Sequence, residues 1–314
     1  YPVNFLLFDY KGEFSDIQNN HWLSHFDVDR SCIIDPIEHP LPFTPFKDLT
    51  DRPINEINLY SSEMASALCS IDRVSASANM NNRLSEAIVE AYKKTEGAPI
   101  TFNMMLEEYQ AKMTDAGKDD SISSVLKQLV RANIFEEEDK ASLIDDCYII
   151  KMDGYPKDGP IAKAIVYFII SKLNNIYEQI EKQATNEDVV QIRHFSIIDE
   201  AHYMLDFDNR PLRNLIAVGR NKGLSIILAT QNMSSFKSKG FDFYANAQYP
   251  LIMKQQTIDD KVIKDLYGVS GQELQEVRTA IAGLQKGELI IKDQMAFALG
   301  MGKKYKKINV THLI

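Results

Sequence analysis

Apolar residues along this chain fall into two alternating patterns. Runs of strand length that are mostly apolar occur in "VNFLLFD", "CYIIKMD", "VVQIRHFSIID", "LSIILAT" and "AQYPLIMKQQ". Between several of them the apolar residues recur at helical spacing, and "PIAKAIVYFIISKLNNIYEQIEKQ" is apolar on most faces, as in a deeply packed helix. Apolar strands that alternate with helices predict an α/β fold, in which a mostly parallel sheet is covered by helices on both faces.

The middle of the chain has a purely helical pattern. Leu84, Ala87, Ile88 and Ala91 form one stripe, and the segments "TFNMMLEEYQAKM" and "SISSVLKQLV" repeat the spacing. The proline-rich "DPIEHPLPFTPF" precedes this region and predicts a loop. We therefore expect a core formed by residues 1–55 and 148–314, interrupted by an α-helical insertion over residues 56–147.

Composition narrows the class of protein. A chain of 314 residues with 45% hydrophobic content can bury a large core, and a net charge of −9 argues against a uniformly basic nucleic-acid binder, although local lysines and arginines could still bind one. The apolar runs are too short to cross a membrane, no secretory signal is present, and three widely spaced cysteines suit a reducing cytoplasm. The start at Tyr1, in mid-pattern, predicts a fragment or a processed piece.

Polar residues follow three of the apolar runs. They are Asp9, the pair Asp199 and Glu200, and the pair Thr230 and Gln231. In a parallel sheet the carboxyl ends of the strands share one edge, which is where ligands bind. An ionised carboxylate at a buried strand costs several kcal/mol unless a cation or hydrogen bonds offset that cost. The pattern therefore predicts a ligand site with a divalent metal at this edge.

The stretch "IIDE" has the form of a Walker B element in a nucleotide hydrolase. In such an element Asp199 would hold Mg²⁺, and Glu200 would deprotonate the water that attacks the γ-phosphate of ATP. An acidic helix N-terminus is the alternative, because the helix dipole also favours acids there. The polar end of "SIILATQN" favours the hydrolase, since Gln231 could sense the γ-phosphate, although a residue that leads from a strand into a loop is often polar in any case.

Basic residues in two segments have open interpretations. Arg213 and Arg220, in "LRNLIAVGRNKG", could stabilise charge in the transition state at a neighbouring subunit's nucleotide, or could lie at a solvated helix end. Lys237 and Lys239, in "NMSSFKSKGF", could contact DNA phosphates from a loop or be simply solvated.

Four motifs in this order, "FDYKGEF", "IIDEAHYML", "GRNKG" and "ILATQN", resemble the HerA/FtsK superfamily of hexameric DNA-pumping ATPases, which includes conjugation ATPases. The resemblance extends from residue 5 to about residue 300, and within the superfamily it is greatest to the phosphorothioation-dependent DNA restriction ATPases. It implies a RecA-like core, ATP and Mg²⁺ as cofactors, and a homo-hexameric ring with DNA in its pore. It also implies a nuclease or another restriction-complex subunit as partner, and no membrane.

The match of motifs also assigns residue roles. Asp199 would be the Walker B aspartate and Glu200 the catalytic glutamate. Gln231 would be the sensor, and Arg220 would be the arginine finger that acts in trans. The remaining candidates are Arg213, as a second catalytic arginine, and Asp9, Lys11 and Thr230, as contacts of the cofactor.

One departure from the family is serious. The Walker A phosphate loop, G-x-x-x-x-G-K-S/T, is absent, and the nearest match, residues 154–159, is followed by Pro160 where the lysine should stand. In the family this loop comes just before the segment that corresponds to "YPVNFLLFDY". We therefore expect that the loop was cut off, lies on an omitted segment or has been lost. Three hypotheses follow. They are a DNA-dependent ATP hydrolase that is inactive as this chain alone, a degenerate scaffold or regulatory subunit, and a DEAH-type helicase core, which would need a second RecA-like domain downstream.

Overall fold

The computed structural model describes residues 3–16, 18, 30–71, 76–95, 99–113, 118–183, 190–205, 207, 209–238, 241–300 and 302–310. The chain divides into two compact units, Tyr1–Leu228 and Ala229–Ile314. Each unit has a sheet and a hydrophobic cluster of its own.

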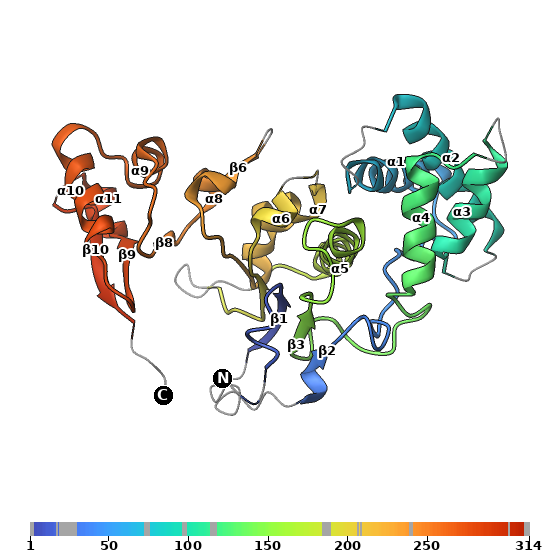
Figure 1. Cartoon of the computed structure of the whole chain (residues 1–314), viewed down its shortest axis with the longest axis horizontal. Helices are drawn as coiled ribbons and strands as arrows, with labels where there is room; N and C mark the ends of the chain where they lie inside the picture. The colour runs from blue at the N-terminus through green and yellow to red at the C-terminus, as the bar shows by residue number, and fades with distance from the viewer. Residues whose placement is uncertain are drawn as a thin grey trace. The chain divides into compact units, whose positions relative to one another are not determined.

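A five-stranded sheet forms the centre of the first unit (Figure 1). Its strands are β1 (Asn4–Asp9), β2 (Ile33–Ile34), β3 (Tyr148–Lys151), β4 (His194–Ile198) and β5 (Leu224–Leu228). They lie in the order β2-β3-β1-β4-β5, and every neighbouring pair is parallel. The prediction of an α/β fold with a parallel sheet is confirmed.

Helices connect the strands of this sheet. Between β2 and β3 come α1 (Ile54–Ile71), α2 (Ala78–Lys94), α3 (Phe102–Ala111) and α4 (Ser121–Ala132). α5 (Pro160–Gln179) joins β3 to β4, while α6 (His202–Leu205), α7 (Arg210–Val218) and the 3-10 helix η3 (Gly219–Lys222) join β4 to β5. α5 packs against α1, α4, α6 and α7, which explains why it is apolar on most faces (Figure 1).

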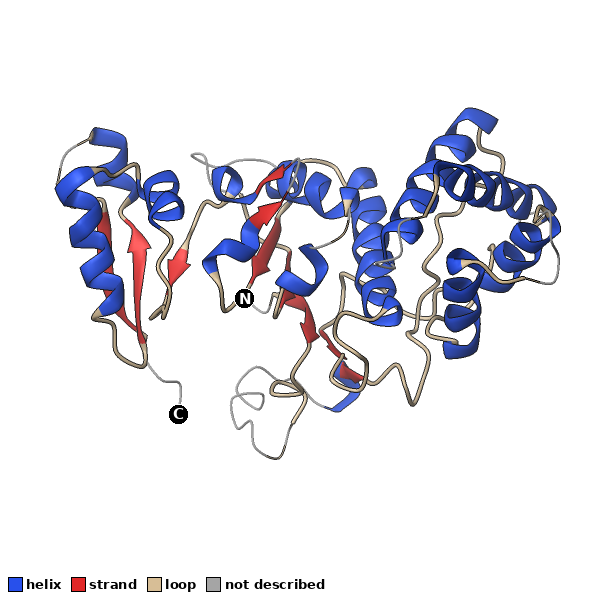
Figure 2. Ribbon diagram, turned by 45° about the horizontal axis from the view of Figure 1, so that its top comes forward, coloured by secondary structure: helices blue, strands red, loops and turns tan. Residues whose placement is uncertain are grey.

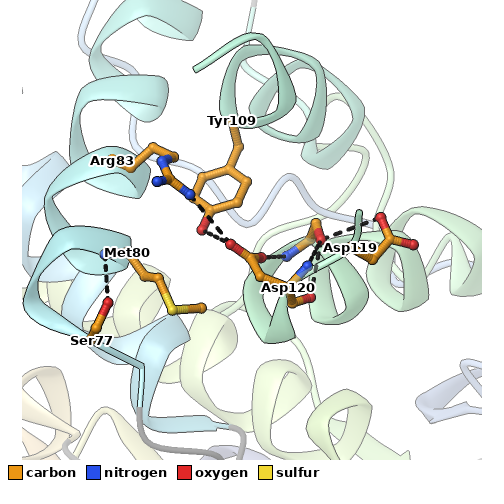
Figure 3. A network of polar contacts seen from close by, with 7 residues as sticks. Ser77, Met80, Arg83, Tyr109, Asp119 and Asp120 are labelled. Atoms are coloured by element: carbon orange, nitrogen blue, oxygen red, sulfur yellow. Dashed lines mark hydrogen bonds and ion pairs between the residues drawn. The ribbon is translucent and has the colours of Figure 1, made fainter. Parts of the chain in front are cut away.

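A polar network holds three helices of the α1–α4 region together (Figure 3). Asp120 caps α4, because its Oδ1 accepts a hydrogen bond from the backbone N–H of Ser123 at 2.9 Å. Its Oδ2 accepts another from the hydroxyl of Tyr109, on α3, at 2.6 Å. The guanidinium of Arg83, on α2, lies 3.4 Å from the same oxygen and over the ring of Tyr109. One carboxylate therefore links α2, α3 and α4.

The two faces of the parallel sheet are covered differently. On one face Ile33, Ile149, Leu7, Ile197 and Ile227 form a row of cross-strand neighbours that runs from β2 to β5. Ile149 and Leu7 are 0% and 3% exposed, but Ile227 is 41% exposed. Among the described residues, the apolar cluster on this face includes no residue of an α-helix. α5 and α7, which pack against each other, therefore cover the opposite face.

The second unit contains a three-stranded antiparallel sheet, in the order β10-β9-β8 (Figure 2). Its strands are β8 (Leu251–Ile252), β9 (Glu288–Lys292) and β10 (Tyr305–Asn309), and its helices include α9 (Asp260–Tyr267), α10 (Gly271–Ala282) and α11 (Gln294–Leu299). The segment "AQYPLIMKQQ" does contain a strand, but assigning it to the parallel sheet was wrong. Ile252 pairs with Ile290 and packs into the cluster that α9 and α10 form, and this burial stabilises the separate sheet.

The remaining elements of the second unit are short. They are the 3-10 helix η4 (Met233–Phe236), the antiparallel pair β6 (Lys237–Ser238) and β7 (Phe241–Asp242), and α8 (Phe243–Asn246). Throughout the part of the chain that the structure describes, no helix combines the length and the apolar character that crossing a membrane requires.

Candidate active site at the carboxyl edge of the parallel sheet

The loop after β1 is organised by Asp9, the last residue of that strand. Asp9 is fully buried, and its Oδ2 accepts hydrogen bonds from the backbone N–H groups of Phe14 and Ser15, at 3.0 and 2.8 Å, and from the hydroxyl of Ser15 at 2.9 Å. Gly12 has a φ of +73°, and a Cβ there would lie 2.6 Å from a carboxylate oxygen of Asp153. The left-handed backbone therefore favours glycine at this turn, and Asp9 closes the loop that carries Lys11.

Lys11 projects from this loop onto Glu200. Its Nζ lies 2.6 Å from Oε1 of Glu200, and the two side chains are 30% and 4% exposed. The hydrogen bond to Glu200 raises the pKa of Lys11, against the opposing effect of partial burial. Since a buried carboxylate is costly without a partner, the ammonium group of Lys11 compensates Glu200 in a nearly dry position.

Glu200 also has an unusual backbone. Its φ is +47°, in the left-handed region that non-glycine residues seldom occupy, within the turn that follows β4. On its other side, Nδ1 of His202 lies 3.2 Å from Oε2 of Glu200. The ring of His202 lies against Tyr203, which stacks on Tyr10. Strained backbone that persists is characteristic of functional sites, because the surrounding contacts must hold it.

Asp199 stands between Glu200 and the end of β4. Burial raises the pKa of its carboxyl group, and the nearby Glu200 and Asp9 carboxylates act in the same direction, against Lys11. Its Oδ2 and Oδ1 of Asp9 are buried and have no hydrogen-bond partner among the described residues. Unpartnered buried oxygens in an acidic cluster suit a cation. Within the described ranges no group of three or more histidines, cysteines and acids could hold a metal, so any ion would need water or a ligand as well.

The two arginines lie at different ends of the connection from β4 to β5. Arg213 is in the first half of α7, which follows the carboxyl end of β4. Arg220 is exposed and lies in η3, just before β5 begins. Gly223, which ends η3, accepts backbone hydrogen bonds through its carbonyl from Arg193 and His194, at the start of β4. Arg220 is thus at the amino end of the strands, and five strand residues at about 3.3 Å each separate that end from Glu200.

Four sequence candidates belong to the second unit. Thr230 and Gln231 follow β5 along the chain, and the hydroxyl of Thr230 accepts a hydrogen bond from the N–H of Asn232 at 3.4 Å. Lys237 is the first residue of β6, and Lys239 lies outside the described residues.

Two residues of this site were not recognised in the sequence. Ser15 supplies two of the three hydrogen bonds to Asp9, and nothing in "GEFS" distinguishes it from an ordinary loop serine. His202 does carry a signal, since it stands two residues after Glu200 in "DEAH" and lies in the first turn of α6, which brings it back to the carboxylate.

No family model matches this sequence, and no curated protein matches it. Solved structures do. VirB4 of Thermoanaerobacter pseudethanolicus is similar, with a TM-score of 0.64 and 16% identity, over 99% of this chain and 82% of that one. The plasmid coupling protein TrwB in complex with ADP and Mg²⁺ gives 0.57 and 12%, over 98% of this chain and 78% of that one. TrwB with the GTP analogue GDPNP gives 0.56 and 14%, over 98% and 79%. At such identities the likeness shows the fold, which is the RecA-like α/β fold.

Proposed function

We propose that this protein is a subunit of an ATP-driven motor that translocates DNA, and that ATP is hydrolysed at the carboxyl edge of its parallel sheet. The observation that carries the proposal is the pair Asp199 and Glu200. Directly after a central strand, one acid has an unpartnered buried oxygen and the other is held by a lysine on a strained backbone. The likeness to TrwB supports ATP and Mg²⁺ as cofactors, because TrwB has been solved with an ATP analogue and with ADP and Mg²⁺.

In this mechanism the two acids have separate tasks. Asp199 would hold Mg²⁺, which when bound neutralises phosphate charge. Glu200 would orient a water molecule and accept its proton as the water oxygen attacks the γ-phosphorus. The bond from that phosphorus to the bridging oxygen of ADP then breaks, and ADP and inorganic phosphate leave. Asp9 and Thr230 would complete the nucleotide contacts, and Gln231 would report the state of the γ-phosphate.

Arg220 would serve a neighbouring subunit. Because it lies at the amino end of β5, while Glu200 follows the carboxyl end of β4, Arg220 cannot reach the site of its own subunit. We propose that it stabilises transition-state charge across an interface between identical subunits in a hexameric ring, with Arg213 as a second candidate. DNA would pass through the ring and contact Lys237 and Lys239, and the partner would be a nuclease of a DNA restriction system.

The phosphate loop would belong to a strand and helix that complete the sheet. β5 is an edge strand of the parallel sheet. In the apolar row that runs across one face of this sheet, Ile227 on β5 is the most exposed residue, at 41%. Connections from β3 to β4 and from β4 to β5 cross the sheet in one direction, with α5 and α7 on one face. A strand added beyond β5 and leading to β1 would cross in the opposite direction. Because such crossovers are right-handed, its helix would lie on the other face, over Leu7 and Ile197. We propose that the phosphate loop joins such a strand to this helix.

Two experiments test the proposed function. In the full-length protein, Mg-ATP hydrolysis should rise on addition of DNA and disappear in Asp199→Ala. A full-length protein that carries a phosphate loop but hydrolyses no ATP would instead be a scaffold or regulatory subunit. Residues 1–314 alone should bind Mg-ATP feebly in calorimetric titration, because the loop's N–H groups, its lysine and the helix dipole supply most of the affinity for the β- and γ-phosphates. Micromolar binding would place the phosphate cradle within these residues.

A further inference from the structure

We propose that Lys11 is the positioning residue of the catalytic base, holding the carboxylate of Glu200 in the orientation from which it accepts the proton of the attacking water. This inference rests on the proposed function. It differs from the role that the sequence resemblance gives to Lys11, which is direct contact with the cofactor. The geometry favours a role of Lys11 in positioning Glu200 over a role in contacting the cofactor, because the lysine ammonium and the glutamate carboxylate are in contact at 2.6 Å.

Because the backbone of Glu200 is strained and its side chain is buried, contacts from other residues are needed to fix its carboxyl group. With φ at +47° the residue is in a sparsely populated region, and its side chain is 4% exposed, so that water can compensate the carboxylate only poorly. Lys11 binds one oxygen, Oε1, and His202 lies 3.2 Å from the other, Oε2. Because Lys11 holds Oε1, it restrains the rotation of the carboxyl group, and this rotation decides where a bound water is deprotonated.

The position of Lys11 is fixed by the loop that carries it. Its loop is closed by the hydrogen bonds that Oδ2 of Asp9 accepts from Phe14 and Ser15, and it turns at Gly12, whose φ of +73° favours glycine. These contacts link the ends of the neighbouring strands β1 and β4. Asp9 holds the loop after β1 by hydrogen bonds, and Lys11, in that loop, contacts Glu200 after β4. Because the backbone of this loop is fixed, the positions that the ammonium group of Lys11 can take are restricted.

The chain offers a matched control. Lys151 ends β3, directly beside Asp9 in the sheet, and its Nζ lies 3.0 Å from a carboxylate oxygen of Asp35. Its side chain is 37% exposed, against 30% for Lys11. Both lysines are therefore partly exposed, at the carboxyl edge, and paired with one acid. They differ in that the acid of Lys11 is the proposed base.

The test compares Lys11→Met, Lys11→Arg and Lys151→Met in the full-length protein. We expect Lys11→Met to lower kcat about tenfold to a hundredfold, because a base displaced by about 1 Å loses that much, while KM and the Kd of a fluorescent ATP analogue change less than about twofold. Lys11→Arg should restore part of kcat, and Lys151→Met should match the parent. An unchanged kcat in Lys11→Met, or a Kd about tenfold weaker, would overturn the inference, the latter by making Lys11 a phosphate contact.

A double-mutant cycle separates this inference from the proposed function. If Lys11 acts through Glu200, Lys11→Met should cause no further loss of single-turnover rate in a Glu200→Gln background, and a further tenfold loss would overturn the inference. If Glu200→Gln alone hydrolyses ATP at the parental rate, the proposed function fails instead. A readout without nucleotide is amine-specific labelling followed by peptide mass spectrometry. Labelling of Lys11 should rise several-fold in Glu200→Gln while labelling of Lys151 stays constant, and equal labelling of Lys11 in both proteins would contradict the contact.

Discussion

Two carboxylates of the first unit, Asp120 and Glu200, both join distant parts of the chain, but they do so in different ways. Asp120 sits at the start of α4 in an ordinary capping geometry, and its two oxygens serve three helices (Figure 3). Glu200 sits on a left-handed backbone at the end of a strand and is nearly inaccessible, with a lysine on one oxygen. The local backbone favours the first arrangement and opposes the second.

This difference separates a structural role from a functional one. A cap and a hydrogen bond to tyrosine lower the free energy of the folded state. Stabilisation of the fold is therefore a sufficient reason for the network of Asp120. Glu200 is strained and buried, and each of these properties costs free energy that the contact with Lys11 offsets only for one orientation of the carboxyl group. We infer that the α2–α4 network was selected for packing and the carboxyl edge for chemistry. Substitutions at the two sites should therefore change different measured quantities.

The largest effect is expected for Glu200→Gln. In the full-length protein it should lower the rate of ATP hydrolysis about a thousandfold or more, because the amide keeps the shape of the base but cannot take the proton. Binding of an ATP analogue should persist, since Asp199 is untouched, and the urea midpoint of unfolding should change little. Hydrolysis at the parental rate would exclude Glu200 as the base. A large fall in the urea midpoint would mean that Glu200 resembles Asp120 after all.

Arg220→Ala tests whether the chemistry of the carboxyl edge depends on a second subunit. We expect hydrolysis in assembled rings to fall about a hundredfold, as for other losses of a transition-state donor. Mixing Arg220→Ala with Glu200→Gln subunits should restore activity at some interfaces, because one type of mixed interface combines an intact Glu200 with an intact Arg220. Equal loss in every mixture would indicate that Arg220 supports only the fold or the assembly and contacts no nucleotide in trans.

The sequence predicts the two regions unequally. Apolar runs identify β1, β4 and β5, and the rule that ligands bind at carboxyl strand ends identifies Asp9, Asp199 and Glu200. The lateral order of strands, with β1 between β3 and β4, depends on contacts between residues far apart in the chain. For the same reason, neither the pairing of Lys11 with Glu200 nor the placement of "AQYPLIMKQQ" in a second sheet could be predicted.

Asp120→Ala should produce the converse of Glu200→Gln. Removing the carboxylate takes the cap from α4 and leaves the hydroxyl of Tyr109 and the guanidinium of Arg83 without this acceptor, so we expect a loss of about 2–3 kcal/mol in the free energy of unfolding. The kcat of the folded full-length protein should be unchanged. Asp119→Ala is the matched control, because its carboxylate pairs with Lys127 at a more exposed position and should matter little. Equal urea midpoints for the two variants would show that the network does not stabilise the insertion.

His194 provides a smaller test, since it is a buried polar group of the core that belongs to neither network. It opens β4 at 0% exposure, and neither ring nitrogen has a hydrogen-bond partner among the described residues. Burial lowers the pKa of this histidine to about 4, against a small opposing effect of Asp145. Burial therefore keeps His194 neutral at pH 7, whereas Glu200 is paired with the ammonium group of Lys11.

The sign of the resulting pH dependence follows from proton uptake. The unfolded chain protonates His194 near pH 6.5 and the folded chain only near pH 4, so stability is complete above pH 6.5 and falls as the pH drops toward 4. Between pH 7 and pH 5 the loss from this group should be about 2 kcal/mol. Urea unfolding at both pH values should show this loss in the parent and in His194→Leu a loss smaller by that amount. His39→Asn, at an exposed histidine, should keep the parental difference. If His194→Leu loses as much stability as the parent does, burial does not hold His194 neutral, and the contrast with Glu200 would fail at this position.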